Sequence, residues 1–134
     1  MPFARLTIAD PTVSPSVQQE LVRSVGKLLV DVLHKEAEVV VTHVNLTSPQ
    51  QWYVGGELVT GATGAHLEVS ITAGTNSAEE KSAFVAQAYA ALADALGVLA
   101  DTVYVAIIEL DGDAYGYNGV TQAQRRRDNP AEKD

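Results

Sequence analysis

The sequence predicts an α/β (α+β) domain in which a four-stranded mixed sheet carries two helices on one face. Two observations predict this fold: the chain repeats itself at a constant offset, and each half alternates strand-like and helix-like apolar patterns. A length of 134 residues suits a single domain, and a hydrophobic fraction of 46% is typical of a globular chain.

An internal repeat is the stronger signal. A shift of 63 residues brings at least nine pairs of identical residues into register without a gap. Two copies are too few for a solenoid, so we expect one domain over 1–134, with halves at about 2–60 and 65–119 and a flexible C-terminal tail over about 120–134. Nine of these pairs are Ile8/Ile71, Thr12/Thr75, Ser14/Ser77, Val22/Val85, Leu29/Leu92, Asp31/Asp94, Leu33/Leu96, Val40/Val103 and Gly56/Gly119.

The first half predicts a strand, a helix and a second strand. Residues 2–8 form a short extended run. Ser14 and Pro15 then open a helix as N-cap and first helical residue. Apolar residues follow at spacings of three and four, which indicates one buried helix face. The valine-rich stretch over 38–46 predicts the second strand.

The second half repeats this plan. Residues 66–72 predict a strand, and Ser77 with Glu80 three residues later forms a capping box at the start of a helix. Phe84, Val85, Ala88, Tyr89, Leu92 and Leu96 form the apolar stripe of that helix. Gly97 ends the helix, and 102–110 is the last strand. Between the halves, Gly55 and Gly56 predict the turn of a short hairpin.

The sheet leaves one face without a helix. Strand–helix–strand crossovers are right-handed, so both helices lie on the same side. The runs over 39–41 and 103–108 are nearly continuous and apolar, which is typical of strands buried on both sides. We therefore expect other subunits to cover the second face, in an obligate oligomer.

Composition excludes several classes of protein. The chain has no cysteine, so it has no disulfide and no thiolate site. Its net charge is −8, and only five cations precede Arg125, which argues against nucleic acid as a partner. No apolar run is long enough to span a membrane, and no secretory signal is visible, so we expect a cytoplasmic protein. The triplet Arg125–Arg127 is either a solvated tail or a group that reaches an anionic ligand.

A combination of motifs resembles a known family. Pro2 directly follows Met1, the strand–helix–strand unit is repeated in tandem, and Trp52-Tyr53-Val54-Gly55-Gly56 follows a strand. Together they resemble the tautomerase superfamily, and among its double-length members the cis-3-chloroacrylic acid dehalogenase group, over about 2–119. The resemblance implies a barrel-like homotrimer without metal or cofactor. It also implies catalysis by Pro2 after removal of Met1.

The chemistry implied for Pro2 is consistent with a free secondary amine. An α-amino group has an ordinary pKa of about 8, and burial beside apolar side chains lowers it further. A neutral amine can take a proton from one atom of an enol and return it to another. We expect keto–enol tautomerisation of a small carboxylate, either an arylpyruvate such as phenylpyruvate or a 2-hydroxydienoate. The alternatives are hydration, dehalogenation or decarboxylation, a noncatalytic binding or assembly domain, and a Pro2 that merely begins an edge strand.

The sequence also departs from the dehalogenases. Where they carry two carboxylate-binding arginines, this chain has Ala73, Thr75 and Asn76. Their helical histidine aligns with Leu29, and their water-activating glutamate aligns with Tyr117. Because the arginines that bind the carboxylate and the glutamate that activates water are both missing, dehalogenase activity is not expected.

The remaining candidates have structural alternatives. Tyr117 is a second catalytic candidate, and its hydroxyl would donate to an enol or carboxylate oxygen. The substrate-binding candidates are Trp52, Thr75, Asn76, Tyr104 and Tyr115. Aromatic side chains also suit subunit packing, and the stretch before Ser77 also suits ordinary helix capping. The three histidines lack the spacing of metal ligands, so no metal site is expected.

Overall fold

The computed structural model describes residues 2–131. Met1, whose removal the resemblance implies, and the last three residues of the expected tail lie outside the described residues. The elements are β1 (Phe3–Ile8), α1 (Pro15–Asp31), η1 (Ala37–Val39), β2 (Val41–Leu46), η2 (Pro49–Gln51), β3 (Tyr53–Val54), β4 (Glu57–Leu58), β5 (Ala65–Thr72), α2 (Ala78–Leu96), β6 (Tyr104–Leu110), β7 (Gly116–Tyr117), β8 (Val120–Thr121) and α3 (Gln122–Asp128).

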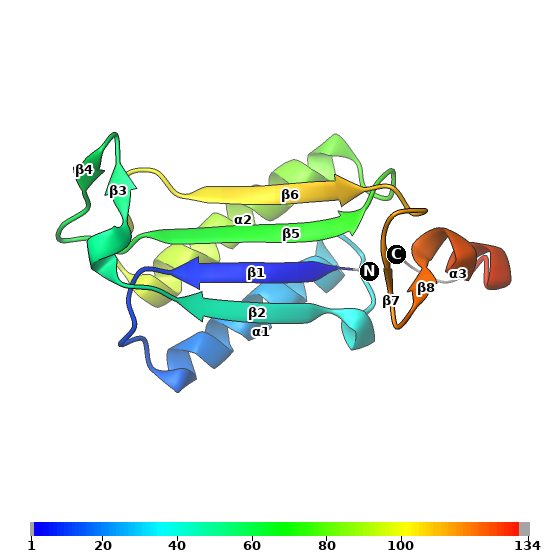
Figure 1. Cartoon of the computed structure of the whole chain (residues 1–134), viewed down its shortest axis with the longest axis horizontal. Helices are drawn as coiled ribbons and strands as arrows, with labels where there is room; N and C mark the ends of the chain where they lie inside the picture. The colour runs from blue at the N-terminus through cyan, green and yellow to red at the C-terminus, as the bar shows by residue number, and fades with distance from the viewer. Residues whose placement is uncertain (1, 132–134) are drawn as a thin grey trace.

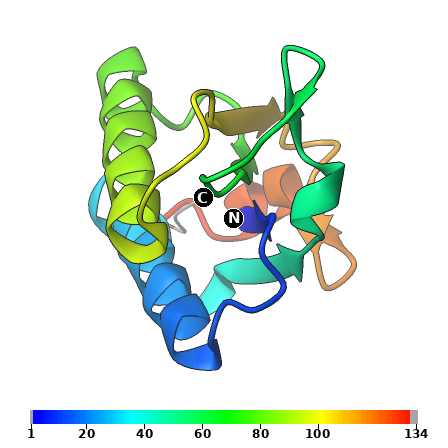
Figure 2. The same cartoon turned by 90° about the vertical axis from the view of Figure 1, so that its left-hand side faces the viewer.

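The four long strands form one mixed sheet in the order β2-β1-β5-β6. β1 runs parallel to β2, β5 runs parallel to β6, and the central strands β1 and β5 are antiparallel. Figures 1 and 2 show α1 and α2 together on one face of this sheet. The predicted four-stranded mixed sheet with two helices on one face is confirmed.

The 63-residue repeat holds in three dimensions. α1 begins at Pro15 and α2 at Ala78, and β2 begins at Val41 and β6 at Tyr104. Each half ends in a hairpin, β3–β4 or β7–β8, and these hairpins are again 63 residues apart. Only the first hairpin was predicted. The second was missed although its turn carries a typical hairpin signal, Asn118-Gly119, in which both residues have a positive φ, 51° and 85°.

The predicted helix starts are confirmed in detail. The Ser14 side chain accepts a hydrogen bond from the Val17 N–H. Ser77 and Glu80 form a complete capping box, and Gly97 follows α2 with a φ of 79°. These local signals are reliable because each one satisfies backbone groups that the helix itself leaves unpaired.

The core lies between the sheet and the two helices. Leu21, Val25 and Leu29 of α1 are buried, and Phe84, Ala88 and Leu92 of α2 face the same layer. Val85 and Tyr89, which were expected in the buried stripe of α2, are instead 37% and 45% exposed. Each follows a core residue by one position, so it lies about 100° around the helix from the buried line.

The other face of the sheet is uncovered within the chain. Its centre is polar: Arg5 of β1 is paired with Glu68 of β5, and their side chains lie 3.7 Å apart. Its margins are apolar, with exposed Val41 on β2 and exposed Tyr104 and Ile108 on β6. Within one chain, the apolar strand segments 39–41 and 103–108 are therefore not buried on both faces of the sheet. That other subunits cover this face stays a prediction.

Part of the stretch expected to be a tail is folded. β8 and α3 together span 120–128, and Gln122 is only 1% exposed. Thr121 caps α3 through the Gln124 N–H, and the Gln122 N–H donates to the Tyr115 carbonyl at 2.7 Å. These bonds attach α3 to the second hairpin. Across the described residues, none of the helices combines the length and the apolar character that a membrane crossing needs.

Candidate active site

A pocket of about 310 Å³ is lined by residues at the start of β1 and in the second hairpin. Figure 1 shows these two elements at the same end of the sheet. Pro2 is buried in it, and the Pro2 carbonyl accepts a hydrogen bond from the Val41 N–H at 3.3 Å, which continues the β1–β2 pairing back to the start of the chain. None of the lining residues is charged. This cavity, here named the Pro2 pocket, is lined by Pro2, Phe3, Val39, Val41, Ser70, Tyr115, Gly116 and Tyr117.

Tyr115 places a hydroxyl group beside the N-terminal strand. The hydroxyl donates to the Ser70 carbonyl oxygen at 3.1 Å. Burial raises the pKa of Tyr115, and a hydrogen bond with the Phe3 backbone opposes this rise. The group therefore stays protonated at neutral pH, next to the residue that follows Pro2.

Tyr117 connects the pocket to α3. The Arg125 guanidinium lies over the Tyr117 ring, with Cζ 3.8 Å from the ring centroid, and Arg125 Nη2 donates to the Tyr117 carbonyl at 2.9 Å. One arginine of the expected tail thus contacts Tyr117, although Arg125 itself does not line the Pro2 pocket. The tight hairpin depends on Gly116, because a Cβ there would lie 2.2 Å from the Val120 carbonyl oxygen.

A second pocket, of about 380 Å³, is the repeat counterpart of the first. It lies beside the β3–β4 hairpin, at the opposite end of the sheet in Figure 1. Seven of its eight lining residues stand 63 positions from a residue of the Pro2 pocket. The corresponding pairs are Ala65/Pro2, His66/Phe3, Thr102/Val39, Tyr104/Val41, Trp52/Tyr115, Tyr53/Gly116 and Val54/Tyr117.

Five of the predicted site residues therefore divide between these two pockets. Pro2, Tyr115 and Tyr117 lie together, whereas Trp52 and Tyr104 line this counterpart, here named the Trp52 pocket. The Trp52 ring packs so closely against Gly64 that a Cβ on Gly64 would lie 2.3 Å from Trp52 Cδ1. Within one chain, neither Trp52 nor Tyr104 lines the Pro2 pocket.

Thr75 and Asn76 join the end of α1 to the start of α2. Thr75 Oγ1 accepts from Lys35 Nζ at 2.8 Å and donates to the Thr72 carbonyl at 2.7 Å. Asn76 Nδ2 donates to the Leu33 carbonyl at 2.9 Å. Their polar groups are engaged in holding the two helices together, and neither residue lines the Pro2 pocket.

Lys35 is a buried cation that the sequence analysis did not single out. It is 3% exposed, and its burial lowers the pKa to about 8, an effect strengthened by Arg126 and opposed by Glu80 and Glu109. His34, with a φ of 61°, turns the chain just before it and lies 3.0 Å from Glu80. No local pattern reveals this burial, because the cover over Lys35 comes from distant elements.

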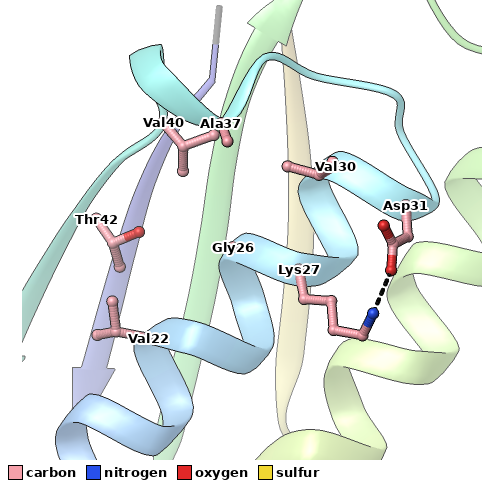
Figure 3. A pocket seen from close by; sticks show the side chains of 8 residues that line it. All are labelled: Val22, Gly26, Lys27, Val30, Asp31, Ala37, Val40 and Thr42. Carbon is pink, nitrogen blue, oxygen red and sulfur yellow. Dashed lines mark hydrogen bonds and ion pairs between the residues drawn. The ribbon is translucent and has the colours of Figure 1, made fainter.

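A third cavity, of about 470 Å³, lies between α1 and the edge strand β2. Figure 3 shows its apolar wall of Val22, Val30 and Val40. Its ionisable lining groups, Lys27 and Asp31, are paired with each other at 2.7 Å. This cavity therefore offers no free acid or base. Among the described residues there is also no cluster of three or more possible metal ligands.

Comparison with known proteins gives a family match over part of the chain. Residues 66–125 match the tautomerase family, described as a tautomerase enzyme. The comparison with curated sequences gave no match. The narrower resemblance to the dehalogenase group stays a prediction.

Solved structures share the fold across most of the chain. A structure titled "Q0 fused 4-OT wild type symmetric trimer" is 20% identical, with a TM-score of 0.82, and the match covers 92% of this chain and 98% of that one. Pt0534 inactivated by 2-oxo-3-pentynoate is 14% identical, with a TM-score of 0.80 and coverage of 90% and 96%. A macrophage migration inhibitory factor-like protein from Entamoeba histolytica is 21% identical, with a TM-score of 0.73 and coverage of 90% and 97%. The chain therefore shares the fold of these proteins.

Proposed function

We propose that this protein is a cofactor-independent tautomerase in which the N-terminal amine of Pro2, freed by removal of Met1, transfers the proton. The observation that carries the proposal is the burial of Pro2 in a pocket without a charged lining residue. Such surroundings disfavour an ammonium ion, so the amine is neutral and basic near pH 7. The tautomerase-family match over 66–125 supports the same class of reaction.

The reaction needs only one base and one returned proton. The Pro2 amine removes the hydroxyl proton of the enol as the C2–O bond becomes a carbonyl, and the electrons of the C2–C3 double bond take a proton at C3 from the ammonium ion. The Tyr115 hydroxyl, which donates to the Ser70 carbonyl in this structure, would exchange that hydrogen bond for one to an oxygen of the substrate and so polarise it. Tyr117 forms a wall of the pocket through its ring.

The substrate that best fits the lining is an arylpyruvate. The pocket presents aromatic and aliphatic side chains, which suit a phenyl ring. A 2-hydroxydienoate is the second choice. Hydration and dehalogenation are less favoured because no lining residue is a carboxylate or histidine that would activate water.

The active form that we propose is a homotrimer. Two of the solved structures that share the fold are titled fused 4-OT trimers. Exposed Val41, Tyr104 and Ile108 at the margins of the open sheet face are suited to burial against neighbouring copies.

The test combines mass spectrometry with a ketonisation assay. Intact mass should show loss of Met1, and the protein should convert phenylenolpyruvate to phenylpyruvate. Treatment with 2-oxo-3-pentynoate, the compound named for Pt0534, should add one equivalent at the N-terminal peptide. Pro2→Ala should lose several orders of magnitude in turnover while its circular dichroism stays unchanged. A form that retains Met1 should be equally inactive, because an amide nitrogen has no useful basicity.

Two results would overturn the proposal. Unchanged turnover in Pro2→Ala would remove Pro2 from the mechanism. Retained Met1 in the native protein, together with no turnover of any enol, would favour a noncatalytic binding domain.

A further inference from the structure

The cavity between α1 and β2 has an equivalent region in the second half of the chain. Each of its eight lining residues has a counterpart 63 positions later, on α2, on β6 or in the segment between them. Four of the eight are identical to their counterparts, among them Val22/Val85 and Val40/Val103. The two halves therefore place a helix and an edge strand around these positions in the same way.

The largest difference between the two halves is at Gly26, whose counterpart is Tyr89. Gly26 lies one helical turn from Val22 and one from Val30, and all three line the cavity. Figure 3 shows Val22 and Val30 on the side of α1 that faces β2. Tyr89 is 45% exposed, so more than half of its surface is covered. The second half thus carries a phenol ring at the position where the first half has a cavity of about 470 Å³.

No steric contact requires a glycine at position 26. A Cβ on Gly26 would have no heavy atom within 4 Å, and the φ of Gly26 is not in the positive region that favours glycine. A glycine inside a helix lowers the stability of that helix relative to alanine. A residue that lowers stability without a local structural reason is expected at functional sites. Here its effect is to leave space between α1 and β2.

The lining of the cavity indicates the chemical class of its ligand. Its walls are formed mainly by valine side chains, which suit an apolar ring. Lys27 and Asp31 are paired with each other at 2.7 Å, so the lining offers no unpaired charge for an ionic ligand. Thr42 supplies a hydroxyl group, which its counterpart Val105 lacks. Figure 3 shows this hydroxyl pointing toward Gly26. A neutral ring that carries one hydrogen-bonding group matches these features.

We propose that the cavity between α1 and β2 binds a neutral phenol. The ring of the phenol lies over Gly26, at the position equivalent to that of the Tyr89 ring, and its hydroxyl forms a hydrogen bond with the Thr42 hydroxyl. This phenol site shares no lining residue with the Pro2 pocket. The inference therefore does not rest on the proposed function, and either can fail without the other.

Titration of the full-length, 15N-labelled protein with phenol tests the proposal by amide NMR. Phenol should shift the amide signals of Gly26 and Thr42 in a saturable way, with a Kd on the order of 1 mM, as suits a ligand of seven non-hydrogen atoms. The absence of a saturable shift of these signals up to about 20 mM phenol would overturn the proposal. A neighbouring copy that covers the cavity in the assembled protein would give that result. Shifts confined to Tyr115 and Tyr117 would place the phenol in the Pro2 pocket and would overturn it too.

Gly26→Tyr gives position 26 the residue of its counterpart. The new ring should occupy the cavity, so the affinity for phenol should fall by at least about tenfold while the circular dichroism stays unchanged. Arg23→Tyr is the matched control, because it adds the same ring at an exposed position of α1 that does not line the cavity. Its affinity for phenol should stay within about twofold of wild type. Wild-type affinity in a folded Gly26→Tyr variant would contradict the proposed position of the ring.

Thr42→Val tests the hydrogen bond separately, and it decides the matter if Gly26→Tyr does not fold. The substitution gives position 42 the residue of its counterpart Val105 and replaces the hydroxyl by a methyl group. The affinity for phenol should fall by about threefold to tenfold, whereas the affinity for benzene, which has no hydroxyl, should change by less than about twofold. Equal changes for phenol and benzene, or no change for either, would show that Thr42 does not bind the phenol hydroxyl and would overturn the proposal.

Discussion

Pro2 and Ala65 occupy equivalent positions, 63 residues apart, at the starts of the two central antiparallel strands. Each lines a pocket beside the hairpin of the opposite half of the chain. Ala65 lies inside the chain, so its nitrogen is an amide in every state of the protein. Pro2 is separated from the N-terminus by one residue only, so its nitrogen becomes an amine when Met1 is removed. The repeat thus supplies two similar cavities, and under the proposed function only the Pro2 pocket gains a basic amine.

The pH dependence of turnover should report the Pro2 amine. An ordinary α-amino group has a pKa of about 8, and the uncharged lining of the pocket favours the neutral form. We expect kcat/KM to rise with pH through a single ionisation below about 8 and then to level off. Rates measured with phenylenolpyruvate from pH 5 to 9 test this. A rate that falls over the same range would mean that the base is another group.

Tyr115→Phe should weaken catalysis without unfolding the protein. The substitution removes the hydroxyl that donates to the Ser70 carbonyl, so the free energy of unfolding should fall by about 1 kcal/mol. The turnover should fall by about tenfold or more, because a polarising donor beside the substrate is lost. Tyr53→Phe removes the same atom from an exposed side chain near the other pocket and serves as the control. Equal activity of the two variants would exclude a catalytic role for the Tyr115 hydroxyl.

The four-stranded sheet and its two helices could be predicted from the sequence. The repeat, the caps at Ser14 and Ser77 and the turn at Gly55 and Gly56 are local signals, and each fixes backbone geometry by itself. The turn of the second hairpin carries an equally local signal, Asn118-Gly119, which the prediction from sequence did not use.

The candidate site was predictable only in part. Pro2 was predicted from the family resemblance. Tyr115 and Tyr117 were predicted as site residues as well, and both line the same pocket as Pro2. The position of Arg125 depends on the packing of α3, and that of Lys35 on the packing of the segment between α1 and α2. Neither kind of packing produces a periodic pattern in the sequence. A run of three arginines near a terminus is typical of a solvated tail, and only tertiary contacts separate Arg125 from Arg127.

Light scattering should give a particle of three times the 14.2 kDa chain mass. Tyr104→Asp should dissociate that particle, because Tyr104 is 69% exposed on the open face of the sheet and an aspartate there opposes burial. Tyr89→Asp is the matched control, since Tyr89 is 45% exposed on the helical side of the molecule and should leave the assembly intact. A stable 14.2 kDa wild-type particle would contradict the proposed trimer.

Two glycine substitutions should change stability in opposite directions. Gly26 lies inside α1 with open space around its missing Cβ, so Gly26→Ala should raise the free energy of unfolding by about 0.5–1 kcal/mol. A Cβ on Gly64 would overlap the Trp52 ring, so Gly64→Ala should lower it by about 1–3 kcal/mol. Urea unfolding at fixed protein concentration measures both, and Trp52 fluorescence should change only in Gly64→Ala. A stabilised Gly64→Ala variant would show that the Trp52 packing is loose.

Lys35 should make stability depend on pH in a defined direction. Burial lowers the pKa of the folded lysine to about 8 from 10.5, so between these values the unfolded chain holds a proton that the folded chain has released. The contribution of Lys35 to stability therefore rises as pH increases from about 8 to 10.5, and below pH 8 the buried ammonium ion is a cost. Lys35→Met removes this titration. We expect the free energy of unfolding of the wild type to rise relative to Lys35→Met between pH 8 and 10.

Urea unfolding of the wild type and of Lys35→Met at pH 7, 8, 9 and 10 measures the two free energies of unfolding. Their difference at each pH cancels the contributions of groups that titrate in both proteins. Lys27→Met is the matched control. Lys27 is exposed and paired with Asp31, which raises its pKa above 10.5, so its difference from wild type should stay flat over this range. If Lys35→Met and wild type also differ by a constant amount from pH 7 to 10, then Lys35 keeps an ordinary pKa in the folded protein, and water or a counter-ion must reach its ammonium group.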